Sequence, residues 1–273
     1  MNKNVPFSEY LQHPGYGSGA VRQALRSLSH LQHYVATRGE PPTPQMLLGS
    51  ATHCAVLEPR EFNERYVTPP EGLDRRTKAG KEAWAMFQEA NQDKQILTSD
   101  QRMAAWTIRD TLAAMPEYRA LVYTNGTASV EVSQFWMDRE TSVELKARAD
   151  MLLDDGVIVD LKTAADASPR GFAAACARFG YHVQAAMYLD AFGEDKYTRF
   201  AFVACETKPP FACGVYWLDE ASIELGRQQY RHALEMLRVY REAISWPIGY
   251  GEQEISLPNY AFHDAEDNVE VQL

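Results

Sequence analysis

The sequence predicts an α/β (α+β) protein in which helices flank one mixed β-sheet. Apolar residues recur with helical spacing through about the first 120 residues, and the period then changes to strand-like alternation between Ser129 and Thr163. Helical patterns return after Ser168, with two further strand-like segments between them. Helices followed by three strands, a helix, more strands and a last helix are typical of a mixed sheet covered by helices.

The first part of the chain is predicted to be helical. Apolar spacing indicates a helix over residues 18–35. Thr43 is a residue type that caps helices, and Pro44 suits the first helical position, so a second helix is expected through Leu57. Two more helices are expected over 82–92 and 99–114, the second ending near Pro116.

The middle of the chain predicts strands. Residues 129–137 and 143–153 alternate, with a turn at 138–142, and Asp154-Asp155-Gly156 forms a second tight turn. The third strand, 157–163, alternates less, which predicts burial on both of its faces. Beyond it we expect a helix over 168–192, strands over 199–205 and 212–218, and a long helix over 219–244.

Composition predicts a single globular domain. The chain has 273 residues without a linker or repeat, so residues 1–273 are expected to form one domain. Its parts are a helical region to about residue 120, a core over 128–220, a long helix over 219–245 and a tail over 245–273 of unknown role. No apolar run approaches the roughly 20 residues that span a bilayer, and no signal core begins the chain. A cytoplasmic protein without a membrane partner is expected.

The net charge of −10 is unusual for a nonspecific nucleic-acid binder, although it does not exclude an enzyme that acts on nucleic acid. One basic strip is a candidate DNA contact, namely Arg75, Arg76, Lys78 and Lys81. A solvated surface explains that strip equally well. The four cysteines form no C-x-x-C pair, which excludes a zinc ribbon and argues for ordinary buried thiols.

The stretch GVIVDLKT, residues 156–163, ends an apolar strand with Asp160 and Lys162. Buried strands carry charge only where the charge is paired or bound. If the turn at 154–156 closes a hairpin, Asp150 and Asp160 come from adjacent strands. Two neighbouring carboxylates repel each other unless a cation joins them, and Mg²⁺ prefers oxygen ligands. The spacing fits metal-dependent phosphodiesterases, whose lysine positions or deprotonates water. A salt-bridged strand pair is the alternative.

Four segments together resemble the RecE-type exonucleases, in the RecB-like branch of the PD-(D/E)XK nucleases. GSATHCAVLEPREF at 49–62 resembles their G-T-x-x-H-x-x-x-L-E-P-x-x-F segment, except that Ser50 replaces the threonine. The others are HPGYGSGAVRQALRSLSHLQHY, SVEVSQFWMDRETSVELKARADMLL, and VDLKTAADASPRGFAAACARFGYHVQAAMYLDAF with its Q-x-x-x-Y signature. The resemblance runs from about residue 8 to about residue 220.

The resemblance implies roles for matching residues. His53, Asp150, Asp160 and the carbonyl of Leu161 would hold the metal, and Lys162 would be catalytic. Gln184 and Tyr188, four residues apart on one helix face, would border the active site. Further DNA contacts are expected among Glu131, Arg148, His182 and the basic strip. Glu131 has the alternative role of a strand-pair partner, and Gln184 with Tyr188 that of an ordinary helix pair.

The resemblance implies a Mg²⁺-dependent enzyme, with Mn²⁺ as a substitute, that digests linear double-stranded DNA 5′→3′. The 3′ overhangs would pass to a single-strand annealing protein, as in phage or prophage recombination, and a ring-shaped trimer or tetramer would enclose the DNA. No Walker motif is present, so ATP is not expected, and the cysteine spacing argues against an iron–sulfur cluster. A nuclease of other polarity, an endonuclease and an inert binding module remain alternatives.

Overall fold

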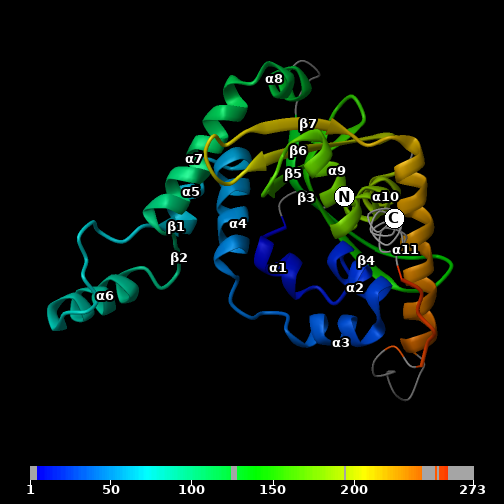
Figure 1. Ribbon diagram of the computed structural model, residues 1–273, viewed down its shortest axis with the longest axis horizontal. Helices are drawn as coiled ribbons and strands as arrows, with labels where there is room; N and C mark the ends of the chain where they lie inside the picture. The colour runs from blue at the N-terminus through cyan, green and yellow to red at the C-terminus, as the bar shows by residue number, and fades with distance from the viewer. Residues whose placement is uncertain (1–4, 124–127, 194, 242–249, 251, 258–273) are drawn as a thin grey trace, which may run out of the picture.

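A five-stranded mixed sheet forms the centre of the computed structural model, which describes residues 5–123, 128–193, 195–241, 250 and 252–257 (Figure 1). The strand order follows the chain, β3-β4-β5-β6-β7. The strands are β3 (Ala128–Met137), β4 (Glu144–Leu153), β5 (Val157–Ala164), β6 (Arg199–Glu206) and β7 (Cys213–Trp217). The predicted fold class is confirmed.

The central strand of the sheet is β5. It pairs antiparallel with β4 and parallel with β6, while β3–β4 and β6–β7 are antiparallel hairpins. The parallel pair requires a crossover, which α9 (Pro169–Phe179) and α10 (Tyr181–Phe192) supply. Residues 157–161 are all buried, as the weak alternation of the third strand predicted.

Helices cover both faces of the sheet because the strands alternate apolar side chains between them. Ile158, Phe200 and Phe202 point into a core shared with α2 (Ser18–Arg26), α10 and α11 (Glu220–Arg241). Val157, Val159 and Leu161 point into the opposite core, against α7 (Ser99–Ala114) and α8 (Pro116–Tyr123). The first of these faces carries Asp160 and Lys162 toward α10.

Two segments that were each predicted to be one helix are two helices in the structure. The segment 18–35 is two helices, because Ser27 has an extended backbone and caps α3 (Leu28–Ala36) by accepting a bond from the His30 amide. The segment 168–192 breaks at Gly180, whose φ of 65° ends α9 and begins α10. Apolar spacing continues across both breaks, so periodicity alone did not reveal them.

The structure contains several short elements that the sequence analysis did not predict. They are α1 (Phe7–Gln12), α5 (Phe62–Arg65), α8, and a small parallel pair formed by β1 (Tyr66–Val67) and β2 (Gln95–Ile96). The helix expected at 82–92 is α6 (Lys78–Ala90), which begins earlier because Thr77 caps it. The helix α4 (Pro44–Leu57) agrees with its prediction, including the Thr43 cap.

The last helix is described through Arg241, and the end expected at Ile244 lies outside the described residues. Most of the tail 245–273 also lies outside them. Within the described residues, no helix combines the length and apolar character that a membrane span needs.

Candidate active site

The predicted juxtaposition of Asp150 and Asp160 occurs where β4 and β5 part. The β4–β5 ladder ends at the pair Met151–Val159, and both aspartates lie one residue beyond that pair, farther from the turn. Beyond that point the backbone amide of Leu161 donates to Asp150 Oδ2 at 2.7 Å, so a side chain replaces the strand ladder. The diverging strands therefore leave two buried carboxylates side by side.

Lys162 and Gln184 enclose Asp160. Lys162 Nζ lies 2.5 Å from Asp160 Oδ2 and donates to Gln184 Oε1 at 3.0 Å. Gln184 Nε2 donates to the other carboxylate oxygen at 2.6 Å. The amide of Gln184 thus contacts both charged partners from α10. Lys162 Nζ also lies over the Tyr181 ring, 4.8 Å from the ring centroid.

Asp160 is nevertheless incompletely satisfied. It is only 2% exposed, and among the described residues its Oδ2 receives no hydrogen bond of acceptable geometry in spite of the short contact with Lys162. Burial raises the pKa of Asp160, and the charge of Asp150 adds to that effect against the opposing charge of Lys162. A buried carboxylate oxygen without a good donor is a candidate ligand for a cation.

A second group joins this one through Asp150. His53 Nδ1, from α4, lies 3.4 Å from Asp150 Oδ1. Burial opposes protonation of His53, but the charge of Asp150 and its hydrogen bond outweigh burial and raise the pKa of His53 to about 9. For Asp150, the effect of burial is likewise outweighed, and the charge of His53 holds its pKa below the usual range. Each residue therefore favours the charged form of the other.

Glu131 completes this group. The sequence predicted Glu131 only as a DNA contact or as a strand-pair partner. One ligand atom each from His53, Glu131 and Asp150 lies within 4.8 Å of the others. Glu131 stands between Val130 and Val132, whose partners Met151 and Ala149 flank Asp150. Strand register would have placed it opposite Asp150. Its φ of 52° is rare for a non-glycine residue and marks local strain at the site.

The donor set fits a divalent cation. Two carboxylates and one imidazole converge here, from Glu131, Asp150 and His53, and the charge of Asp150 also acts on Asp160. Hard divalent ions take carboxylate oxygens, while imidazole suits several metals. Burial first, and then the charge of Asp150, raises the pKa of Glu131. Asp150, Asp160, His53 and Lys162 are brought together as predicted. The carbonyl of Leu161 has no described contact that bears on its expected role.

Tyr188 lies beneath the carboxylates, and it is 5% exposed. Burial, followed by Tyr10, Asp160 and Asp150, raises the pKa of Tyr188 well above its ordinary value, so the hydroxyl stays protonated. It shares one face of α10 with Gln184, as its spacing predicted.

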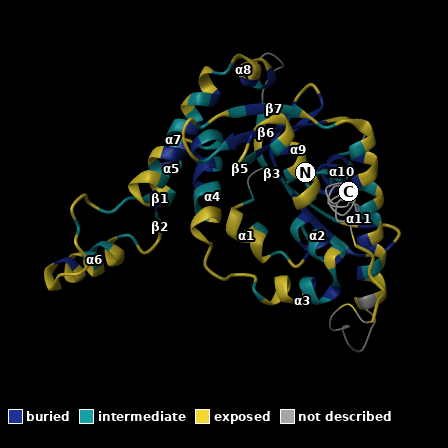
Figure 2. Ribbon diagram, in the orientation of Figure 1, coloured by how far each residue is buried: buried dark blue, intermediate teal, exposed yellow. Residues whose placement is uncertain are grey.

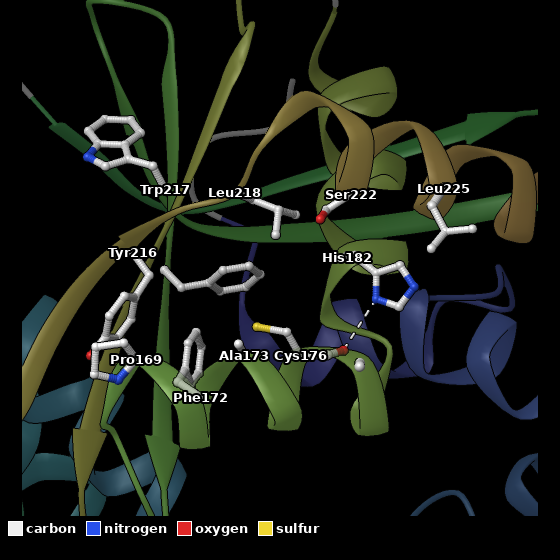
Figure 3. A pocket seen from close by; sticks show the side chains of 12 residues that line it. Pro169, Phe172, Ala173, Cys176, His182, Tyr216, Trp217, Leu218, Ser222 and Leu225 are labelled. Carbon is white, nitrogen blue, oxygen red and sulfur yellow. Dashed lines mark hydrogen bonds between the residues drawn. The ribbon is translucent and has the colours of Figure 1, made fainter. Parts of the chain in front are cut away.

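His182 does not join the carboxylates. It lines a pocket between α9, β7 and α11, where its ring points toward α9 (Figure 3). Its Nε2 lies 2.8 Å from Gln229 Oε1, and its Nδ1 lies 3.3 Å from the Cys176 carbonyl. Both ring nitrogens therefore have protein partners, which agrees with a structural role for His182, and its contact with DNA stays a prediction.

Arg148 is also engaged within the protein. It donates to Glu131 Oε2 at 2.5 Å and to Ser133 Oγ at 2.8 Å. It further donates to the Val5 carbonyl at 2.9 Å, and the Phe7 ring lies over it. With a side chain only 11% exposed, Arg148 orients Glu131, and its expected contact with DNA stays a prediction.

The basic strip is remote from the carboxylates. Arg75, Arg76, Lys78 and Lys81 are exposed and lie on or next to α6, which projects from the body of the molecule (Figure 1). The structure therefore does not bring them into the candidate active site.

The chain is similar to several known proteins in structure or sequence. A crystal structure described as a "Putative exonuclease" from Eubacterium rectale is 11% identical, with 91% of this chain and 97% of that chain covered and a TM-score of 0.56. An alkaline exonuclease from Laribacter hongkongensis is 18% identical, with coverage of 71% and 96% and a TM-score of 0.29. A search of curated proteins finds no significant match. The model of a PDDEXK-like domain of unknown function (DUF3799) matches residues 21–256, so the chain belongs to that family.

Proposed function

We propose that this protein is a divalent-metal-dependent exonuclease that hydrolyses phosphodiester bonds from the ends of linear double-stranded DNA. The observation that carries the proposal is the convergence of Asp150, Asp160 and Lys162 where β4 and β5 part. His53 and Glu131 extend this group, and an arrangement with this much buried negative charge needs a cation.

His53, Asp150, Asp160 and the carbonyl of Leu161 would hold Mg²⁺, with Mn²⁺ as a substitute. Glu131 adds a carboxylate on the side of Asp150, and Arg148 keeps it in place. When bound, the ion supplies charge stabilisation at the phosphate and lowers the pKa of a water molecule.

Lys162 would contact the scissile phosphate or the attacking water. Its ammonium is already held by Asp160 and Gln184, so little orientational freedom remains to be lost on binding substrate. Gln184 is a positioning residue, because it bonds to both members of the pair. Tyr188 supports the same face of α10 from below.

The resemblance supports the finer features of the proposal. They are 5′→3′ polarity without ATP, 3′ overhangs handed to a single-strand annealing protein, and a ring-shaped trimer or tetramer in the bacterial cytoplasm. An endonuclease with the same chemistry is the alternative that the experiment must separate.

The test uses linear duplex DNA labelled at either the 5′ or the 3′ end, with Mg²⁺ and without ATP, beside covalently closed circles. Early release of 5′ label as mononucleotide, with intact circles, supports the proposal. The Lys162→Ala protein should be inactive, whereas Arg139→Ala, which changes an exposed arginine at the β3–β4 turn, should act as the wild type does. Cut circles would indicate an endonuclease, and the absence of all cleavage would indicate an inert binding module.

A further inference from the structure

An arm formed by residues 68–94 projects from the protein between β1 and β2 (Figure 1). It contains α6, a helix of 13 residues in which Gly80 alone is buried. Figure 2 shows most of α6 in the colour of exposed residues and the segments on either side of it in the colours of exposed and intermediate residues. The side chain of Met86 is 70% exposed. The arm therefore adds surface without adding to the core of the protein.

The root of the arm is firmly packed. Tyr66 of β1 and Leu97, just beyond β2, belong to a buried cluster with Ala51, Cys54 and Ala55 of α4. His53 lies on the same helix, among these residues. The arm consequently has a fixed origin beside the helix that contributes to the candidate metal site, although its tip lies away from the carboxylates.

One end of the arm carries local positive charge in an acidic protein. Residues 74–81, DRRTKAGK, carry four cations and one carboxylate, whereas residues 68–94 as a whole carry five of each, within a chain of net charge −10. Arg76 pairs with that carboxylate, Asp74, and the Arg75 guanidinium lies over the Trp84 ring at 4.7 Å. Among described residues, no carboxylate oxygen lies within 4.0 Å of the ammonium nitrogen of Lys78 or Lys81.

Lys78 and Lys81 do not stabilise the start of α6. They stand in its first turn, which holds no acidic residue, and Glu82 follows in the next turn. Cations at that end of a helix oppose the helix dipole. Local sequence rules are typically broken where a residue serves binding.

We propose that the arm is a binding site for the phosphate backbone of duplex DNA, contacted by Arg75, Lys78 and Lys81. The inference rests on the proposed function, because it places the bound DNA relative to the same active site. A helix of this length spans about 20 Å, and duplex DNA carries one charge per about 1.7 Å of axis. A second copy of this chain offers only ten net negative charges over 16892 Å² of surface, so DNA is the better complement.

The test compares two variants with equal charge changes. The arm variant combines Arg75→Gln, Lys78→Gln and Lys81→Gln. The control variant combines Arg119→Gln, Arg139→Gln and Lys208→Gln, three exposed cations on the body of the molecule. Binding of a fluorescein-labelled blunt duplex is measured by anisotropy in EDTA, which prevents hydrolysis, at several salt concentrations. Thermal unfolding checks that both variants fold.

The arm variant should bind at least about tenfold more weakly than the control at low salt, and its salt slope should fall by about 2 to 3, near one for each lost phosphate contact. Equal affinities and equal slopes for the two variants would overturn the proposal. A changed oligomeric state in sedimentation, with an unchanged salt slope, would overturn it in favour of a contact between copies.

A second substrate separates this proposal from the proposed function. Thymidine 5′-(p-nitrophenyl) phosphate is a phosphodiester too small to reach from the active site to the arm. The wild type and the arm variant should hydrolyse it equally in Mg²⁺ or Mn²⁺. Failure of the wild type to cleave this ester and DNA would defeat the proposed function alone, because arm binding is measured without catalysis. A matched loss of ester cleavage in the arm variant would contradict the arm's role.

Discussion

Two groups of buried carboxylates in this protein differ in how completely they are satisfied. Asp138, at the β3–β4 turn, accepts from the Thr141 amide at 2.8 Å and the Thr141 hydroxyl at 2.6 Å. It also pairs with Arg231 of α11. In contrast, Asp160 has an oxygen without a good donor and is exposed to the charge of Asp150, which itself lies close to Glu131 and His53.

The difference distinguishes a carboxylate with a structural role, Asp138, from carboxylates whose arrangement suits a bound cation. Asp138 is 9% exposed and Asp150 is 8% exposed, so burial alone does not distinguish them. The pKa of Asp138 is affected first by burial, which raises it, but the hydrogen bonds from Arg231 and Thr141 prevail and lower it. Burial instead prevails at Asp160 and Glu131, whose pKa values are raised.

The largest expected effect is on catalysis at the unsatisfied group. Asp160→Asn should lower DNA hydrolysis by about a thousandfold or more, because metal-ion catalysis supplies several kcal/mol of transition-state stabilisation. Because the raised pKa of Asp160 means that its charged form is disfavoured in the folded protein, the loss of this charge should offset the loss of the Lys162 ion pair. The free energy of unfolding without metal should therefore change by no more than about 1 kcal/mol at neutral pH. Nucleotide release and urea denaturation measure the two effects. Lost stability at unchanged activity would make Asp160 structural.

A smaller effect is expected for the residue that positions this group. Gln184→Leu keeps the approximate volume but removes the bonds to Asp160 and Lys162. We expect kcat to fall by about 10- to 100-fold, in the range typical of residues that orient a metal site, with KM little changed. Steady-state kinetics provide the measurement. A raised KM at constant kcat would assign Gln184 to substrate binding.

The satisfied group should show the opposite pattern. Asp138→Asn should lower the free energy of unfolding at neutral pH by about 1 to 3 kcal/mol, since it weakens charge-assisted hydrogen bonds to Arg231 and Thr141. Its lowered folded pKa means that its stabilisation is complete above the unfolded pKa and disappears as pH falls through the folded pKa. Denaturation of the wild type and variant should therefore converge in acid. A difference that persists there would refute the ion-pair explanation.

The smallest effect is expected on α4, four residues before His53. A Cβ at Gly49 would lie 3.5 Å from Thr163 Oγ1, which is ordinary van der Waals contact. Gly49→Ala should therefore raise the free energy of unfolding by about 0.5 to 1 kcal/mol through helix propensity. DNA hydrolysis should be unaffected. A large loss of activity would show that DNA or metal approaches the backbone here.

The sequence was informative about the site because strand geometry is regular. Alternation and the tight turn at 154–156 were enough to place Asp150 beside Asp160, and the four-residue spacing placed Gln184 with Tyr188. The resemblance added His53, which comes from a distant helix that no local pattern could connect to the strands.

Other features depended on contacts that local patterns do not record. Glu131 joins the site through register and a strained backbone, and Arg148 contacts Val5 and Phe7, more than 140 residues earlier in the chain. The break at Gly180 and the projection of α6 were missed for similar reasons. A left-handed glycine and an unpacked helix both retain ordinary helical spacing on either side.

Calorimetric titration of Mn²⁺ into the metal-free protein tests the contrast between the two carboxylate groups most directly. The wild type and Asp138→Asn should bind the ion with equal affinity, whereas Asp160→Asn should lose at least about tenfold in affinity. Mutation of a residue that only hydrogen-bonds to a metal ligand typically costs about 10- to 100-fold, and loss of the ligand itself should cost at least as much. Equal binding by the wild type and Asp160→Asn, or no binding by the wild type, would contradict the assignment of the buried carboxylates to a metal site.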